Sequence, residues 1–335
     1  MNKILILGCD GYIGEHLLEE LEGEDTILYG YDLKNTKQNT RKLLKEFYIG
    51  DIQDVDCLER CILEVNPNTI IDLAANAEVH ENSTLNDYSM NFCTPDNIIK
   101  ILEKSPHLDL SRLVFTSSQY VIGPEHSGDN KMGYAPHTIY GISKVMLEQR
   151  LLNLYERYKK QGSDIVIIRP TNVWGGRHPK YSNMWEKLLE KKLVIIPSKE
   201  VIKSYCHIST LCSLFKNAAN TENLNLSIDN LIIYGTDAPI TQKKWVELQT
   251  TGLKENGLMA GFFQTPIWFL YFLSSVLELV TMILRVSNPL PFSRVKSMTY
   301  SYLVSLESPE NLQFNASYDE LLPIVIKDIE KRKIG

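Results

Sequence analysis

A tyrosine and a lysine in the segment TIYGISKVMLEQ have the spacing of a proton-transfer pair. Tyr140 and Lys144 stand four residues apart at the start of a predicted amphipathic helix, so both lie on one helical face. A free tyrosine has a pKa of about 10, and a neighbouring ammonium group lowers it toward the range of an efficient base at neutral pH. The same spacing occurs by chance on any helix. The pair alone therefore leaves two interpretations open, proton transfer and a shared helical face.

The first residues of the chain combine a strand, a glycine loop and a helix. KILILG is typical of a central parallel strand, and EHLLEELEG shows a helical pattern. Between them, Gly8, Gly11 and Gly14 follow the spacing GxxGxxG. Such glycines permit a tight turn and let the backbone approach a pyrophosphate, which the helix N-terminus then faces with its N–H groups. The loop predicts a dinucleotide site.

An acidic residue ends the next predicted strand. Asp32 follows Gly14 by 18 residues, at the end of DTILYGYD. A carboxylate at this place accepts hydrogen bonds from the ribose hydroxyls and repels a 2′-phosphate. NAD is therefore expected in preference to NADP.

Strands and helices continue to alternate over the first two thirds of the chain. Further strand segments are FYIGDI, TIIDLAANA, RLVFTSS and DIVIIRP, with helical patterns such as DCLERCILEV between them. This order predicts an α/β fold, a Rossmann-type doubly wound parallel sheet that binds ligands at the carboxyl ends of its strands. We expect an NAD-binding domain of residues 1–171, to which 203–235 return, and a smaller C-terminal substrate lobe of 172–202 and 236–335.

Together these segments resemble the extended short-chain dehydrogenase/reductase family, in its NAD-dependent epimerase/dehydratase branch, which acts on nucleotide sugars. The resemblance runs from Met1 to about Leu211 and includes GDI, LAANA, NFCTPDN, TSSQYVIG, YGISKVMLE and RPTNVWG, in this order. It implies that Tyr140 is the acid/base, that Lys144 lowers its pKa and holds the nicotinamide ribose, and that Ser118 hydrogen-bonds the substrate oxygen. It also implies NAD contacts from Gly8, Asp10, Gly11, Tyr12, Ile13, Gly14, Asp32, Asp51, Ile52, Leu73, Ala74, Ala75, Asn91, Tyr140 and Lys144.

Two departures from the family pattern narrow the reaction. Gln119 and Tyr120 stand where the family's dehydratases carry an Asp-Glu pair, and its decarboxylases place a glutamate where Tyr120 stands. Dehydration and decarboxylation are therefore disfavoured, and the resemblance implies an NAD-dependent epimerase of the nucleotide-sugar 4-epimerase kind. Two alternatives stay open. One is a hydroxysteroid dehydrogenase-like oxidoreductase acting on a hydrophobic or lipid-linked alcohol, and the other is a non-catalytic NAD-binding regulatory protein.

Three residues besides Ser118 are expected to contact the substrate. Asn172 matches a family asparagine near the nucleotide-sugar diphosphate, and Lys203 replaces the arginine that usually meets this group. A lysine meets a phosphate as a point charge and not as a bidentate fork. Arg177, directly after a Gly-Gly turn, is expected to contact an anionic substrate.

The last hundred residues depart from the family and contain one long apolar segment, residues 267–284. Its polar residues form one helical stripe with the arginine that follows: Ser274, Ser275, Glu278, Thr281 and Arg285. The stripe argues against a transmembrane span. We expect burial, in the substrate lobe or at an interface between copies, in preference to peripheral contact with a membrane.

Composition excludes several classes of protein. The chain has 335 residues, 44% hydrophobic and 23% charged, as in ordinary globular proteins. A net charge of −6 disfavours a nucleic-acid partner. The six cysteines show no zinc-type pairing, so we expect no metal and reduced thiols in a cytoplasmic protein. The expected partners are a small-molecule substrate and a second copy in a homodimer.

Overall fold

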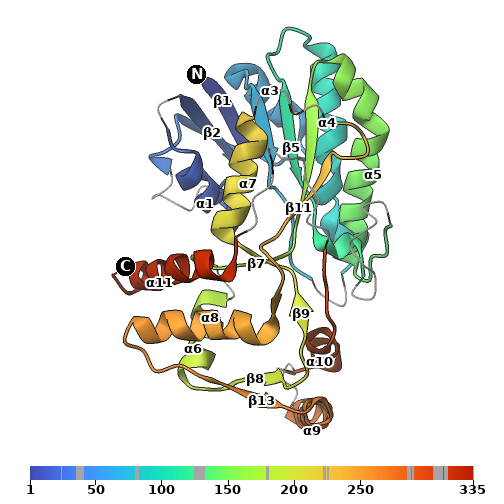
Figure 1. Cartoon of the computed structure of the whole chain (residues 1–335). Helices are drawn as coiled ribbons and strands as arrows, with labels where there is room; N and C mark the ends of the chain where they lie inside the picture. The colour runs from blue at the N-terminus through green and yellow to red at the C-terminus, as the bar shows by residue number, and fades with distance from the viewer. Residues whose placement is uncertain are drawn as a thin grey trace.

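A seven-stranded sheet forms the centre of the larger lobe in the computed structural model (Figure 1). Its strands are β1 (Asn2–Leu7), β2 (Thr26–Asp32), β3 (Glu46–Ile49), β4 (Thr69–Asp72), β5 (Arg112–Thr116), β6 (Asp164–Pro170) and β11 (Ile232–Gly235). All the pairings in this sheet are parallel. The structure describes all residues except 24, 35–40, 80–82, 124–132, 179–180, 222–223, 225, 285–287, 289, 305–311, 313–315 and 335.

The strand order places one switch point at the centre of the sheet. The order is β11-β6-β5-β4-β1-β2-β3, so the chain moves outward from β1 in one direction and then returns to continue from β4 in the other. The segments that follow β1 and β4 therefore leave the same edge in opposite directions, which opens a ligand site between them. The predicted Rossmann-type α/β fold is confirmed.

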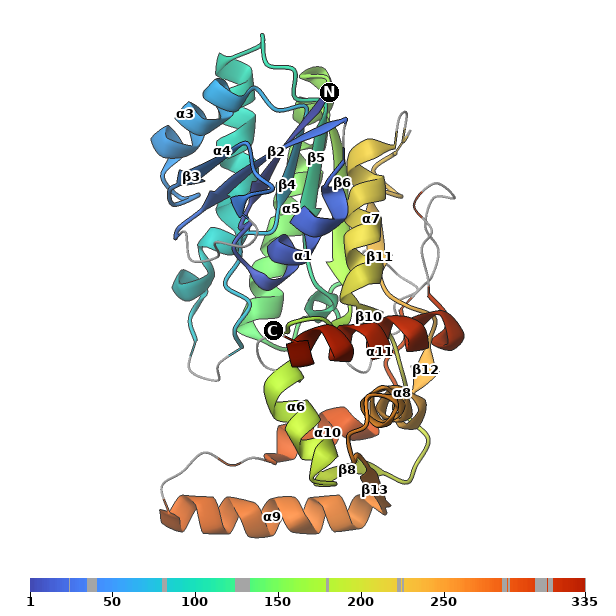
Figure 2. The ribbon, with the colours of Figure 1, turned by 90° about the vertical axis from the view of Figure 1, so that its left-hand side faces the viewer.

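Helices cover both faces of the sheet. On one face α1 (Tyr12–Leu21) packs against α7 (Ile208–Asn220), and on the other α4 (Met90–Lys104) packs between α3 (Val55–Val65) and α5 (Ile139–Lys160) (Figure 2). Because β1 is covered from both sides, its residues 4–7 are fully buried. Short 3₁₀ turns, η1 (Leu85–Tyr88) and η2 (Gln119–Val121), follow β4 and β5. They lie at the carboxyl edge, where the site forms.

A smaller lobe lies below the carboxyl edge of the sheet in Figure 1. It contains α6 (Tyr181–Glu190), β8 (Val194–Pro197), α8 (Gln242–Glu255), β13 (Phe262–Thr265), α9 (Ile267–Leu284), α10 (Phe292–Thr299) and α11 (Tyr318–Ile334). Two short strand pairs join the lobes: β7 (Asn172–Trp174) with β10 (Tyr205–His207), and β9 (Ile202–Lys203) with β12 (Ile240–Thr241). The lobe has its own hydrophobic cluster, in which Trp245 stacks on Tyr205 at 4.5 Å between ring centroids. The predicted domain boundaries stay a prediction.

The helix α9 occupies the predicted residues, but the expected burial within the substrate lobe is wrong, while burial at an interface between copies stays a prediction. Its polar residues Ser274 and Thr281 are buried, whereas most of its large apolar side chains are exposed. The Ser274 hydroxyl donates to the Leu290 carbonyl at 2.8 Å, so this side of α9 faces the protein, whereas Ser275 and Glu278 of the predicted stripe are exposed. Arg285 lies outside the described residues. None of the helices in the described part is long and apolar enough to cross a membrane.

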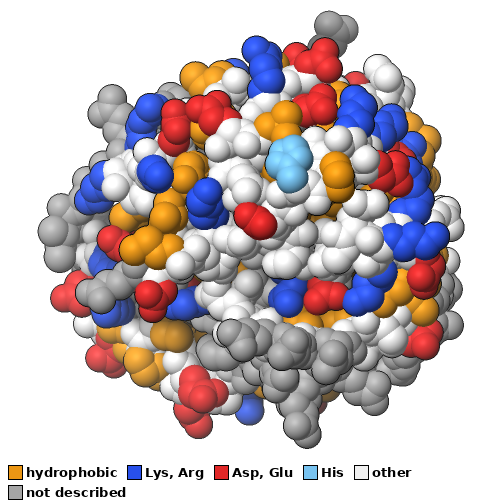
Figure 3. Space-filling view, turned by 90° about the horizontal axis from the view of Figure 1, so that it is seen from above, with side chains coloured by type: hydrophobic (Ala, Val, Ile, Leu, Met, Phe, Trp, Pro, Cys, Tyr) orange, Lys and Arg blue, Asp and Glu red, His pale blue; other side chains and the backbone are white. Residues whose placement is uncertain are grey.

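The opposite end of the molecule has a different surface. Figure 3 shows the face at the amino ends of the strands, where lysine, arginine and acidic side chains are interspersed with small apolar areas. The exposed apolar face of α9 therefore contrasts with this end of the molecule.

Candidate active site

The glycine loop after β1 lies against the end of β4. Gly8 has a φ of +77°, and a Cβ there would lie 2.7 Å from the backbone nitrogen of Ala74. A Cβ on Gly14 would lie 2.6 Å from the backbone oxygen of Cys9. Both positions therefore exclude any side chain, one for the turn and close strand contact and the other for helix packing. This is the arrangement that the GxxGxxG spacing predicts.

The N-terminus of α1 and the end of β2 form one polar corner. Gly11 caps α1 without a side-chain hydrogen bond, and its Cβ position is close only to the Gly8 carbonyl, at 3.2 Å. The Asp32 carboxylate accepts from the backbone N–H of Asp10 at 2.9 Å and from that of Leu33 at 2.7 Å. Burial raises the pKa of Asp32, and these hydrogen bonds lower it. A helix end without a side-chain cap, beside a fixed carboxylate, fits the pyrophosphate and ribose of NAD.

Two predicted cofactor residues, Asp51 and Ile52, follow β3. The Asp51 side chain accepts from the Gln53 N–H at 2.9 Å, and its carbonyl accepts from the Tyr31 hydroxyl at 3.0 Å. Ile52 is buried, and its carbonyl accepts from the Asn97 side chain at 3.0 Å. Asp51 and Ile52 are thus fixed at the carboxyl edge of the sheet. Their contact with NAD stays a prediction.

The remaining predicted cofactor residues line the switch point or support it. Leu73 continues the β4 ladder by donating to the Leu7 carbonyl at 2.9 Å, and half-buried Ala74 and Ala75 follow it. Ile13 packs against the main core. The Tyr12 hydroxyl donates to the Gly175 carbonyl at 2.7 Å, which ties α1 to the segment after β7.

Asn91 is buried and holds two segments together. Its side chain accepts from the Asn76 N–H at 2.7 Å and donates to the Asn76 carbonyl and to the Ser143 hydroxyl, each at 3.0 Å. It therefore links the segment after β4 to α5, the helix that carries Tyr140. The structure gives Asn91 a positioning role, and its predicted NAD contact stays a prediction.

Ser118, Tyr140 and Lys144 are brought together at the carboxyl edge. Burial raises the pKa of Tyr140 to about 12, and a hydrogen bond with Ser118 acts in the opposite direction. The rings of Tyr120 and Tyr88 flank the Tyr140 ring, at 5.7 Å and 6.0 Å between centroids. Tyr88, which sequence reasoning did not single out, thus forms one wall of the site.

A buried carboxylate influences the charge of the lysine. The Lys144 ammonium donates to the Thr116 carbonyl at 2.8 Å. Burial lowers the pKa of Lys144 to about 8, and Asp72 is the largest influence that raises it. Asp72 was missed from the sequence, although it ends β4 at the edge where ligands bind. The predicted effect of Lys144 on the pKa of Tyr140 stays a prediction, since Ser118 is the group that lowers that pKa here.

A fully buried ion pair supports this edge from behind. Glu148 on α5 and Arg169 on β6 lie 2.6 Å apart, and neither side chain is exposed. The Ser117 hydroxyl donates to Glu148, and Arg169 donates to the Tyr234 hydroxyl at 2.9 Å. The ion pair therefore holds α5 and β6 together beside Ser117, the residue before Ser118.

The predicted substrate residues lie in three different surroundings. Asn172 accepts from the Gln119 amide at 2.9 Å and donates to the Ser204 carbonyl at 3.2 Å, so it stands directly beside the Ser118 turn. Lys203 donates to the Ser297 carbonyl at 2.7 Å, and burial lowers its pKa to about 8.

Arg177 is engaged by α1 and not by the residues near Ser118. It forms ion pairs with Glu19 at 2.8 Å and Glu15 at 3.4 Å, both on α1. The structure therefore does not bring it together with Ser118 and Tyr140.

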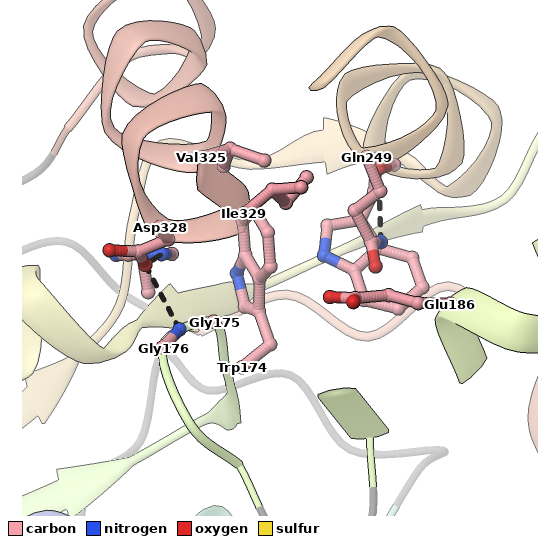
Figure 4. A pocket seen from close by; sticks show the side chains of 10 residues that line it. Trp174, Gly175, Gly176, Glu186, Gln249, Val325, Asp328 and Ile329 are labelled. Carbon is pink, nitrogen blue, oxygen red and sulfur yellow. Dashed lines mark hydrogen bonds and ion pairs between the residues drawn. The ribbon is translucent and has the colours of Figure 1, made fainter. Parts of the chain in front are cut away.

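A pocket between the lobes lies beside this edge but does not contain its chemistry (Figure 4). Its wall includes Trp174, Glu186, Gln249, Val325 and Asp328. Figure 4 shows Asp328 on α11 accepting from the Gly176 N–H, at 3.0 Å. Ser118, Tyr140 and Lys144 are not among the lining residues, so the pocket is separate from the predicted catalytic residues.

Comparison with known proteins identifies similar chains. The family model described as "NAD dependent epimerase/dehydratase family" matches residues 4–225. The chain is 27% identical to dTDP-D-glucose 4,6-dehydratase of Dictyostelium discoideum, over 64% of this chain and 55% of the relative. It is 29% identical to UDP-glucose 4-epimerase of Streptococcus mutans, over 52% of this chain and 53% of the relative. These matches thus span little more than half of each relative.

Two further similarities cover more of the chain. Sterol-4-alpha-carboxylate 3-dehydrogenase, decarboxylating, of Mus musculus is 22% identical over 84% of this chain and 76% of the relative. Among solved structures, UDP-glucose 4-epimerase of Thermotoga maritima, determined with UDP-glucose, superimposes with a TM-score of 0.69 at 19% identity, over 99% of both chains. The structural similarity supports the fold along the whole length.

Proposed function

The chain belongs to the NAD dependent epimerase/dehydratase family, whose cofactor is NAD, and from this premise we propose that it is an NAD-dependent epimerase of nucleotide sugars. One observation carries the proposal. Tyr140 lies beside Ser118, which lowers its pKa, and one helical turn from Lys144, at the edge that also holds the glycine loop. The dehydratase-type acids are replaced by Gln119 and Tyr120, and the Gln119 side chain is already engaged by Asn172.

In the proposed reaction Tyr140 moves a proton in both directions. Bound NAD supplies the hydride acceptor and, in the second half, the hydride donor. Tyr140, as the phenolate, takes the proton of the sugar hydroxyl, while Ser118 holds the oxygen as it becomes a carbonyl. The keto sugar then rotates in the site, so that the opposite face of its carbonyl group is turned toward the nicotinamide. Tyr140 returns the proton to the oxygen, so the product is the epimer and no net oxidation occurs.

The charged groups near Tyr140 suit this cycle. Burial disfavours the charged phenolate and so raises the pKa of Tyr140 to about 12. Lys144 carries a positive charge below a pH of about 8, where it stabilises the phenolate and holds a ribose hydroxyl. Asn91 supports the arrangement by joining α5 to the segment after β4.

The diphosphate of the sugar nucleotide is assigned to Asn172 and Lys203. Asn172 lies beside the Ser118 turn, and Lys203 carries a part-buried ammonium that a phosphate would stabilise. A role for Arg177 in substrate binding requires its ion pairs with Glu15 and Glu19 to open.

The test is product analysis. The purified protein is incubated with a panel of sugar nucleotides that begins with UDP-glucose, and the sugars and NADH are measured separately. An epimer that forms without stoichiometric NADH supports the proposal. A ketone released with an equal amount of NADH contradicts it. Mass spectrometry of molecules that copurify with the protein would identify the nucleotide.

A second candidate function is favoured by two observations. The exposed apolar helix α9 lies in the substrate lobe, and the mouse sterol dehydrogenase matches 84% of the chain. An oxidoreductase acting on a hydrophobic or lipid-linked alcohol, with peripheral membrane contact through 267–284, would account for both. Stoichiometric NADH from a sterol or polyprenol, and none from sugar nucleotides, would favour this alternative.

We also propose that the protein works in the cytoplasm as a homodimer. All six cysteines are free, four of them buried, as expected of a protein in a reducing compartment. Light scattering coupled to size-exclusion chromatography measures the oligomeric state, and a monomeric mass at the concentration that supports turnover would contradict the dimer.

A further inference from the structure

The helix α9 presents a continuous row of large apolar side chains to solvent. Trp268, Phe272, Leu279 and Ile283 are 69%, 60%, 58% and 70% exposed, and Val276 between them is 41% exposed. The spacing of three and four residues places these five side chains on one side of the helix. We call this row the α9 face. In a protein interior each of these side chains would be removed from water, so a face of this size indicates contact with another apolar phase.

The polar residues of α9 leave the middle of this face apolar. Ser275 is exposed about 60° from the middle, and its hydroxyl donates to the Tyr271 carbonyl of the same helix at 3.0 Å. Ser274 and Thr281 are buried on the opposite side, where the Thr281 hydroxyl bonds its own helix at the Leu277 carbonyl at 2.7 Å. Glu278 is exposed, but it lies about 120° round the helix from the middle of the α9 face, at about 100° per residue. The carboxylate can therefore stay in water while the α9 face is buried.

Neighbouring elements extend the apolar surface. Phe263 on β13 is 59% exposed and Phe292 on α10 is 47% exposed. The Phe292 ring lies 5.3 Å from that of Tyr271, at the end of α9 nearest β13. Figures 1 and 2 agree that α9 lies at the end of the molecule farthest from the sheet. The surface is thus a projecting edge, not a groove that would receive a peptide.

The charge around this edge is positive in a chain that is acidic overall. The described residues of 191–200 and 257–300, which include β8, β13, α9 and α10, carry five lysines and arginines against two acidic residues, whereas the whole chain carries 35 against 41. Lys191, Lys192, Lys199, Arg294 and Lys296 are exposed. Lys191, Lys192 and Lys199 come from a segment distant in sequence from α9, whereas Arg294 and Lys296 lie on α10, the next helix. Exposed lysines beside an apolar helix favour an anionic lipid surface.

We propose that α9 lies in the plane of an anionic lipid bilayer, with the α9 face in the acyl boundary and the surrounding lysines and arginines at the headgroups. At about 1.5 Å per residue the 18-residue helix extends about 27 Å along the surface. A second copy is the weaker choice of occupant. A two-fold contact through the same edge would bring two sets of basic side chains together, and anionic lipid neutralises them instead.

The test is cosedimentation with vesicles of phosphatidylcholine alone and with vesicles of phosphatidylcholine and phosphatidylserine in equal parts. The native chain should bind the second kind and bind the first weakly. The double variant Phe272→Asp/Ile283→Asp should lower binding by about tenfold or more, because two buried apolar side chains become charged. The matched control Leu63→Asp/Ile228→Asp changes two exposed apolar residues of the other lobe, 39% and 41% exposed, and should bind as the native chain does.

A second measurement uses tryptophan emission. All four tryptophans lie in the described part, and Trp268 is exposed whereas Trp174 and Trp245 are buried and Trp185 is half-buried. Emission should shift to the blue when the anionic vesicles are added, and Trp268→Phe should abolish the shift. NAD binding, measured in parallel, confirms that each variant is folded. The proposal is wrong if the native chain does not bind the anionic vesicles, or if Phe272→Asp/Ile283→Asp changes the oligomeric state and leaves vesicle binding unaltered.

Discussion

Asp72 and Lys144 stabilise each other's charge at the carboxyl edge of the sheet, although both side chains are buried. Burial raises the pKa of Asp72 to about 6 and lowers that of Lys144 to about 8, and each group is the largest influence that opposes the shift of the other. Near neutral pH both are charged. The edge therefore holds a buried ammonium group that needs its carboxylate, one turn of α5 away from Tyr140.

Asp72→Asn should lower the pKa of Lys144 further, because burial then acts on the ammonium with less opposition. A lysine binds as a cation below its pKa, so any NAD affinity that depends on Lys144 is present below a pH of about 8 and is lost above it. In the variant this loss should occur at lower pH, by about one unit. Titrating NAD binding against pH in both proteins measures the shift, and superimposable curves would show that Asp72 does not control Lys144.

Asp32→Ala should weaken NAD binding by about tenfold to a hundredfold and should reduce the preference for NAD over NADP, because it removes a charge-assisted acceptor for the ribose hydroxyls. The Asp32 carboxylate is held by two backbone N–H groups, which fixes its position at the end of β2. Calorimetric titration with both cofactors measures this. A native chain that prefers NADP by tenfold would contradict the assignment.

Arg169→Met should destabilise the fold by about 3–5 kcal/mol, because it leaves the Glu148 carboxylate buried without its partner. The double variant Glu148→Leu/Arg169→Met should recover much of this loss. Arg157→Met, which breaks the exposed pair with Glu103, is the matched control and should unfold close to the native chain. Denaturant unfolding followed by circular dichroism measures the stability of each variant. An Arg169→Met variant as stable as the control would show that the buried ion pair does not stabilise the fold.

Local pattern was sufficient to predict the strands, the glycine loop and the end of β2. The apolar residues 4–7 of KILILG are buried on both faces as predicted, and Gly8 and Gly14 stand where no Cβ fits. These features depend on neighbours within a few residues or on a shared strand edge, so their spacing in the sequence carries the information. The same holds for Tyr140 and Lys144 on α5.

Contacts between segments that are distant in the sequence could not be predicted from local pattern. Nothing in the sequence pairs Glu148 with Arg169 or sets Tyr88 beside Tyr140, because these contacts form only when α5 packs on the sheet and η1 folds back. The orientation of α9 depends likewise on the bond from Ser274 to the Leu290 carbonyl. Its polar stripe was recognised, but the side that faces the protein was not.

The most direct test of the central claim is the turnover of Tyr140→Phe compared with its NAD affinity. The substitution removes the hydroxyl and keeps the ring that packs between Tyr88 and Tyr120, so the fold and the cofactor site should stay intact. If Tyr140 is the proton-transfer group, turnover should fall by about 10²–10⁴ while NAD affinity changes little. Lys144→Ala should lower both. A Tyr140→Phe variant that keeps turnover within about tenfold of the native chain would contradict the account, because an effect that small is less than the loss of a general acid/base causes.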